Sequence, residues 1–436
     1  MSERGTLKRP DWFTPKLEAR RTRRRYRAER RFKLYGLAAI GIGLAFLALL
    51  FYKIGSTAYP AFTENVLELE VTYDKDVVSP DGSTDLETLR NGDYATVVQN
   101  ALKRYIQLPE DDADGQRLLG ALLSSDADAR VRAELMRDPS LLGKTHKVWV
   151  LASGDVDSHL KGLFDAAVPE ADRRVKDRQL AWLQKFRADG RLETRFAWTL
   201  FFGTSSAEPQ TAGLGVALLG SLYMMILIFL LCVPLGVATA VYLEEFAPKN
   251  RWTDLIEVNI NNLAAVPSIV FGILGLAVFL NFFDLPRSSA LVGGLVLTLL
   301  ALPTVIIATR AAFKAVPPSI RQAALGIGAS KMQMIGHHVL PLAVPGIMTG
   351  TIIALAHAIG ETAPLLMIGM VAQVFNIPAT PLDPATALPV QIYMWSGEQE
   401  RGFVPRTSAA IVVLLAFLIT MNAIAIYLRK KFERRW

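Results

Sequence analysis

A carboxylate, Glu361, and a histidine one helical turn before it, His357, lie inside a long apolar stretch of the sequence. An ionisable side chain at membrane depth is costly, so a functional role is the default hypothesis for it. The i, i+4 spacing places both side chains on one face of a helix. The pair could handle an anion, or a His–Glu hydrogen bond could only lock the helix. We predict the first, with His357, Glu361 and Thr362 along a substrate pathway.

A glycine-rich, basic stretch at residues 326–331 has the wrong spacing for the phosphate-binding loop of an ATPase, and no strand precedes it. No nucleophile–base arrangement stands out elsewhere. His146 and His159 do not have the spacing of metal ligands. We therefore predict no enzyme activity, no cofactor and no metal site. The energy for any active transport would come from another polypeptide or from an ion gradient.

The composition indicates a membrane protein that carries one soluble domain. Of the 436 residues 51% are hydrophobic, but residues 55–205 have mixed charges while long apolar runs fill much of the remainder. The formal net charge is +7, and the basic residues crowd the two termini, at 20–33 and 429–435. Basic flanks beside apolar spans set topology, so we predict contact with membrane lipid and not with nucleic acid. With Cys232 as the single cysteine, no intrachain disulfide can form.

Six apolar segments are long enough to span a membrane. They cover residues 34–53, 213–243, 261–283, 289–309, 343–370 and 408–428. The first follows a long Arg-rich stretch without a clean small-x-small site after it, which favours an uncleaved anchor over a signal peptide.

Basic residues in the short loops predict the orientation. They gather at the N-terminus, in the 244–260 and 310–342 loops and at the C-terminus. We therefore predict that these four segments lie in the cytoplasm and that the chain spans the inner membrane of the cell. The predicted parts are a cytoplasmic N-terminus (1–33), an anchor (34–54), a periplasmic domain and linker (55–212), a five-helix core (213–428) and a cytoplasmic tail (429–436).

The periplasmic segment has the pattern of a small α+β domain. Residues 67–73 alternate apolar and polar side chains, as a half-buried strand does. Asp93 could cap a helix that runs through Tyr105, and a second helix is expected around residues 174–187. The fold class expected for the chain is an all-α polytopic membrane protein with an inserted α+β domain.

The 310–342 loop carries a spaced motif. Ala323, Ala324, Gly328, Leu340 and Pro341 match the EAA motif of binding-protein-dependent ABC importers at its spacing. In this pattern E-A-A is followed by three residues, Gly, nine residues and I-x-L-P. The loop therefore resembles the segment with which such permeases dock on their ATPase. Alanines give a helix a slim contact face, and Gly328 permits a left-handed turn. Pro341 could begin the next helix.

Two loop residues depart from that motif: Gln322 stands in place of the Glu, and His338 in place of the Ile. The missing Glu removes a possible ionic contact with the ATPase.

The core as a whole resembles the PstA-type permease of the phosphate importer. The resemblance covers about residues 209–430, and its motifs lie at residues 266–276, 302–307, 358–366 and 387–393. It implies the MetI-like fold, a sister permease, an ATPase dimer and a periplasmic phosphate-binding protein. His357 departs from the family, which usually has an Arg there that is implicated in moving the anion.

The function expected from these features is that of an importer permease for inorganic phosphate. One rival keeps the class and changes the cargo to molybdate, sulfate or phosphonate. A membrane-anchored sensor is a second rival, but six spans without a cytoplasmic output domain argue against it. A secondary transporter is a third, and no second half of the sequence matches the first.

Overall fold

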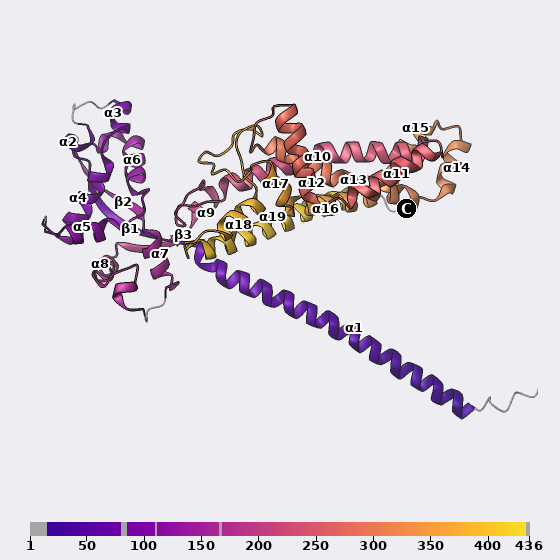
Figure 1. Cartoon of the computed structure of the whole chain (residues 1–436), viewed down its shortest axis with the longest axis horizontal. Helices are drawn as coiled ribbons and strands as arrows, with labels where there is room; N and C mark the ends of the chain where they lie inside the picture. Colours follow the sequence, from indigo (N-terminus) through magenta and orange to yellow (C-terminus); the bar gives the residue numbers. More distant parts are fainter. Residues whose placement is uncertain (1–14, 80–84, 110, 165–167, 433–436) are drawn as a thin grey trace, which may run out of the picture. The chain divides into compact units, whose positions relative to one another are not determined.

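The computed structural model describes residues 15–79, 85–109, 111–164 and 168–432. The first 14 residues of the predicted cytoplasmic N-terminus and the last four of the basic tail lie outside the described residues. The chain divides into two compact units, residues 1–56 and 57–436. Figure 1 shows the helices and strands of both units.

The described residues of the first unit all belong to one helix, α1 (Pro15–Ala58), and the last two residues of this helix are counted in the second unit. Its 44 residues carry the Arg-rich stretch and the first apolar span without a break. At 1.5 Å per residue such a helix is about 66 Å long, roughly twice what a bilayer core requires. The predicted anchor at 34–54 therefore has a helical, basic extension at its N-terminal end.

A three-stranded antiparallel sheet of order β2–β1–β3 organises the domain that follows, which we call the inserted domain (residues 63–196). Its strands are β1 (Thr63–Thr72), β2 (Thr145–Leu151) and β3 (Leu192–Phe196). In β1, Leu67, Leu69 and Val71 are buried while Glu70 is exposed. This alternation confirms the strand that the sequence predicts.

Short helices accompany this sheet. They are α2 (Lys75–Val78), α3 (Leu86–Arg90), α4 (Tyr94–Ile106), α5 (Ala113–Gly120), α6 (Ala127–Arg137), α7 (Gly154–Leu160) and α8 (Asp177–Ala188), with the 3₁₀ turns η2 (Pro139–Leu141) and η3 (Glu170–Asp172). Of these, α4, α6, α7 and α8 contact the strands of the sheet. Asp93 caps α4 as predicted, because its carboxylate accepts a 3.0 Å hydrogen bond from the Thr96 amide. The predicted second helix corresponds to α8.

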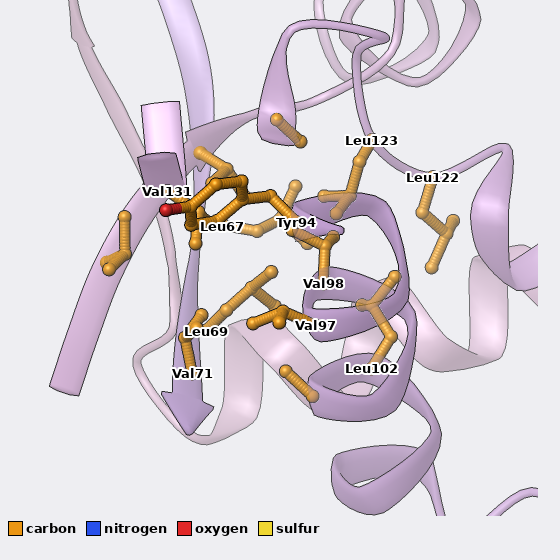
Figure 2. Close-up of a cluster of buried hydrophobic side chains, with 14 of the residues drawn as sticks. Leu67, Leu69, Val71, Tyr94, Val97, Val98, Leu102, Leu122, Leu123 and Val131 are labelled. Carbon is orange, nitrogen blue, oxygen red and sulfur yellow. The ribbon is translucent and has the colours of Figure 1, made fainter. Parts of the chain in front are cut away.

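The inserted domain has a hydrophobic core of its own. Figure 2 shows Val97, Val98 and Leu102 of α4 beside the side chains of β1, with Leu122 and Leu123 nearby. Tyr73 is also fully buried, and its hydroxyl donates to the Val131 carbonyl at 3.0 Å. Burial raises the pKa of Tyr73, so this hydroxyl stays protonated.

Both ends of the inserted domain are rooted in the helical core. The turn η1 (Tyr59–Phe62) precedes β1, and helix α9 (Trp198–Phe202) follows β3. Ala61 and Leu200 from these ends are buried in one cluster with Trp395 and Phe403 of the core. The domain thus has a hydrophobic core of its own, and its two ends form a root, a second buried cluster that they share with the helical core.

A buried polar seam adds to this root. Arg406 is 3% exposed and donates to the Gln210 carbonyl at 3.1 Å. Gln210 Nε2 in turn donates to Ser124 Oγ of the inserted domain at 3.2 Å. Asp157 of that domain lines the same cavity as Arg406 and forms an ion pair with Lys161. Burial lowers the pKa of Lys161, and Asp157 opposes that shift. Charges that are buried together in this way resist separation, because each would lose its partner.

We predict that a fragment of residues 63–196 is soluble and unfolds in one cooperative transition, because the core of the domain is complete without the root. Chemical denaturation followed by circular dichroism should give an m-value of about 1–3 kcal/mol/M in urea. Leu67→Ala should lower the stability by about 2–5 kcal/mol, since it leaves a cavity in this core. A fragment that needs detergent or shows no transition would show that the domain folds only with the membrane core.

The helical core contains the remaining elements. These are α10 (Gly215–Val241), the π-turn η4 (Tyr242–Phe246), α11 (Arg251–Ala264), α12 (Ser268–Gly275), the π-turn η5 (Leu276–Phe282), α13 (Ala290–Ala315), α14 (Pro318–Gly326), α15 (Lys331–Met334), the π-turn η6 (Ile335–Val339), α16 (Leu340–Gly360), α17 (Ala363–Met367), α18 (Leu388–Ser396) and α19 (Phe403–Phe432).

Five helices among the described residues are long and apolar enough to cross a membrane, or six if one bent pair counts as a span. The bent pair corrects the predicted third span, residues 261–283. Its two helices, α11 and α12, meet at an angle of 100° beside Pro267. Proline cannot donate to the preceding turn and disfavours the helical conformation of the residue before it, so the helix breaks there.

Helix α13 lies at the centre of the bundle and contacts α10, α11, α12 and α16. Gly346 and Gly350 of α16 face it, because a Cβ at either position would overlap the Cβ of Ala312 or Ala308. The two glycines form a G-x-x-x-G spacing, which allows the two helices to approach each other closely.

Candidate functional site

The loop after α13 forms two short helices, α14 and α15, which a turn connects. Helix α14 ends at Gly326, and Gly328 has a φ of +88°, which only glycine adopts without strain. Ser330 then caps α15, with Gln333 completing a capping box. The helix–turn–helix expected from the motif is therefore present, with Gly328 at the turn.

Pro341 lies in the first turn of α16, as its position predicts, but no break separates this helix from the elements before it. Residues 331–360 form one continuous helical segment in which the π-turn η6 stands directly before Pro341. Proline lacks the amide that would bond to His337, and its ring crowds the carbonyl there. The wider π-turn accommodates this loss within the helix.

The loop has its own small core and an apolar outer surface. Ala324, Met334 and Val339 are buried together with Phe313. Outside this core, Ile327 is 82% exposed, and Leu325 and Met332 are also exposed. A rigid loop with exposed apolar side chains at its tip is suited to insertion into a partner.

The six predicted loop residues differ in how far they are buried. Gln322, Ala323 and Gly328 are exposed, Ala324 belongs to the loop core, and Leu340 and Pro341 are half-buried at the start of α16. The first three residues are thus available to a partner, whereas the others hold the loop in shape.

His357 and Glu361 lie at the end of α16. The distance between His357 Nε2 and Glu361 Oε1 is 3.5 Å, and the two side chains are 62% and 23% exposed. The structure therefore brings the predicted pair together, with His357 on the surface of the bundle and Glu361 turned partly inward. Thr362, directly after them, is half-buried.

Helix α16 ends at Gly360, and Glu361 has an extended conformation (φ −80°, ψ 120°) before α17 begins at Ala363. The predicted span over residues 343–370 is therefore broken at Glu361. An irregular backbone at membrane depth is tolerated where it is buried in protein or lines a water-filled cavity.

The break at Glu361 lies beside a second feature that hydropathy did not reveal. Helix α17 packs against α12, where Gly272 meets Pro364 so closely that a Cβ would not fit. Helix α12 follows the bend at Pro267, so two broken helices are neighbours. The prolines at 267 and 364 were the signal in the sequence for these irregular elements.

Nothing in the described part of the chain is arranged for metal chemistry, because no group of three or more His, Cys, Asp or Glu side chains could hold a metal ion. The loop after α13 and the His357–Glu361 pair are instead suited to two physical roles. One is to present a structured loop to a partner, and the other is to offer a polar pair at a helix break within an apolar bundle.

Two family models match the chain. Residues 232–436 match the inner membrane component of binding-protein-dependent transport systems. Residues 19–170 match a domain of unknown function, DUF3333, which covers most of α1 and much of the inserted domain.

Curated relatives are similar to part of the chain. The probable ABC transporter permease protein YqgI of Bacillus subtilis is 36% identical over 163 residues, which cover 37% of this chain and 55% of that protein. The phosphate transport system permease protein PstA 1 of Mycobacterium tuberculosis is 31% identical over 238 residues, which cover 55% of this chain and 77% of that protein. The chain thus spans little more than half of the first relative and about three quarters of the second.

Among solved structures, the inward-facing MetNI methionine ABC transporter matches with a TM-score of 0.40 and 16% identity, over 50% of this chain and 97% of that one. The sequence matches alone carry the assignment. The chain belongs to the binding-protein-dependent ABC transporter permeases. It is a multi-pass membrane protein of that importer class, not itself an enzyme, with a DUF3333 domain before the permease core. The predicted fold class is confirmed.

Proposed function

We propose that this permease subunit imports inorganic phosphate. The observation that carries the proposal is the 31% identity with a phosphate transport system permease over three quarters of that protein. The same core carries the residues on which the resemblance to PstA-type permeases rests. Phosphate itself undergoes no covalent change in this role.

The proposed assembly contains this chain, a sister permease, an ATPase, which we take to be a dimer, and a periplasmic phosphate-binding protein. In the proposed orientation, the loop from α14 to α16 faces the cytoplasm and docks on the ATPase through its exposed tip. The inserted domain then lies in the periplasm as an accessory module that modulates the binding protein or another partner. The distribution of basic residues in the short loops supports this orientation.

The proposed anion path runs past His357, Glu361 and Thr362, in the space between the two permeases. The large exposed fraction of His357 on the bundle surface supports this placement, because a sister permease could cover it. Lipid contact would instead leave a polar pair in hydrocarbon, at a cost of a few kcal/mol. Phosphate is anionic, so Glu361 needs a basic partner, which His357 supplies when it is protonated.

ATP hydrolysis by the reconstituted importer tests the cargo. Proteoliposomes would contain this permease, its sister and the ATPase, with the binding protein and one oxyanion added. The proposal predicts that phosphate stimulates hydrolysis several-fold more than sulfate, molybdate or a phosphonate does. Equal or greater stimulation by one of those anions would assign the permease to that cargo.

A further inference from the structure

Two consecutive carboxylates in the π-turn η4 each hold an arginine from a distant part of the sequence. Glu244 Oε1 lies 2.6 Å from Arg310 Nε on α13, and Glu245 Oε1 lies 3.0 Å from Arg321 Nε on α14. The Glu245 side chain is 7% exposed. These are buried pairs and not solvated surface contacts, so the loss of one partner would leave an uncompensated charge.

Arg321 makes two further hydrogen bonds that explain why an arginine stands there. Its Nη1 donates to the Val316 carbonyl at 2.7 Å, and its Nη2 donates to the Phe313 carbonyl at 2.8 Å. These carbonyls lie at the C-terminal end of α13, where a helix has acceptors without an intrahelical partner. A cation is also favoured at this end of the helix dipole. One guanidinium thus joins α14 to the end of α13 and to η4.

The second arginine, Arg310, connects the core elements to which Arg321 joins α14. Arg310 also binds Glu257 of α11 at 2.6 Å through Nη2, and Lys314 lies 3.3 Å from Glu244. Elements α11, α13 and η4 are therefore cross-linked by charged hydrogen bonds. Through Arg321 and Glu245, the angle of α14 is set relative to three elements of the core.

We propose that Arg321 and Glu245 form a positioning clamp that holds α14 at the angle needed to transmit ATPase movement to the spans. This inference rests on the proposed docking of the loop on the ATPase. Without the clamp, α14 remains joined to the core mainly through the few apolar side chains of the loop core, and it can tilt. Movement of the ATPase is then absorbed by the loop and no longer passed on to α13 and α16.

The test compares Glu245→Gln, Arg321→Gln and the double variant in the full chain. Asp254→Asn is the matched control, because Asp254 is an exposed carboxylate in the first turn of α11. A nitroxide at Ile327→Cys reports the mobility of the loop in the permease alone, with the buried Cys232 replaced by Ala. Phosphate transported per ATP hydrolysed, in the reconstituted importer, reports coupling. Cross-linking from Ile327→Cys to the ATPase reports docking.

Each single variant should increase nitroxide mobility and reduce phosphate transported per ATP at least five-fold, while Asp254→Asn changes neither. The double variant should be no worse than the worse single one, because both remove the same interaction. Unchanged mobility and unchanged coupling in both single variants, with the wild-type cross-link present, would overturn the clamp. Increased mobility without a wild-type cross-link would instead overturn docking and leave the clamp as a structural tie.

Discussion

His357→Leu should reduce phosphate uptake at least ten-fold while the chain still inserts and assembles. Leucine removes the only basic partner within reach of Glu361 that the described residues show, so the carboxylate would repel the anion. His357→Arg should keep uptake, because arginine supplies a permanent charge.

The measurement is uptake of labelled phosphate at equal amounts of permease in the membrane. Ile353→Leu provides the control, because Ile353 lies one turn earlier on the same exposed face of α16 and carries no charge. Normal uptake by His357→Leu would refute a role for this pair in the pathway.

Gly328→Val should also abolish most transport, through the coupling loop. A β-branched residue at a φ of +88° costs about 1–2 kcal/mol or more, and the turn between α14 and α15 would rearrange. A Cβ at this position would meet nothing within 4 Å, so the effect comes from the backbone and not from a clash. Asn tolerates this conformation better, and Gly328→Asn should therefore retain more transport than Gly328→Val.

Gly326→Ala is the matched control for this turn. It is the neighbouring glycine, it ends α14, and a Cβ there also meets nothing within 4 Å. Alanine favours a helix over glycine, so this variant should transport normally. Equal transport by Gly328→Val and Gly326→Ala, at matched membrane levels, would contradict the docking model.

Local signals in the sequence predicted much of the fold. Alternation over residues 67–73 predicted β1, and Asp93 predicted the start of α4. These features depend on neighbours in the chain, so a single sequence contains them. The proximity of His357 and Glu361 was also predictable from their spacing in the sequence, although Glu361 lies one residue past the end of α16 and has an extended conformation.

Features that depend on tertiary contacts were not predictable in this way. A hydropathy window averages over the bend at Pro267, so a broken pair of helices was read as one span. Arg406 is buried at the seam with the inserted domain, and no local pattern in the sequence indicates this. Glu245 and Arg321 are separated by 76 positions, and no local pattern relates them.

Uptake of labelled phosphate by a deletion strain tests the central claim most directly. The strain would lack its own phosphate importers and would express this permease with its sister, ATPase and binding protein. We expect uptake that depends on ATP and on this chain. Excess sulfate, molybdate or phosphonate should not block this uptake. Uptake of one of those anions in place of phosphate would contradict the claim, as would a complete, assembled importer that transports none of them.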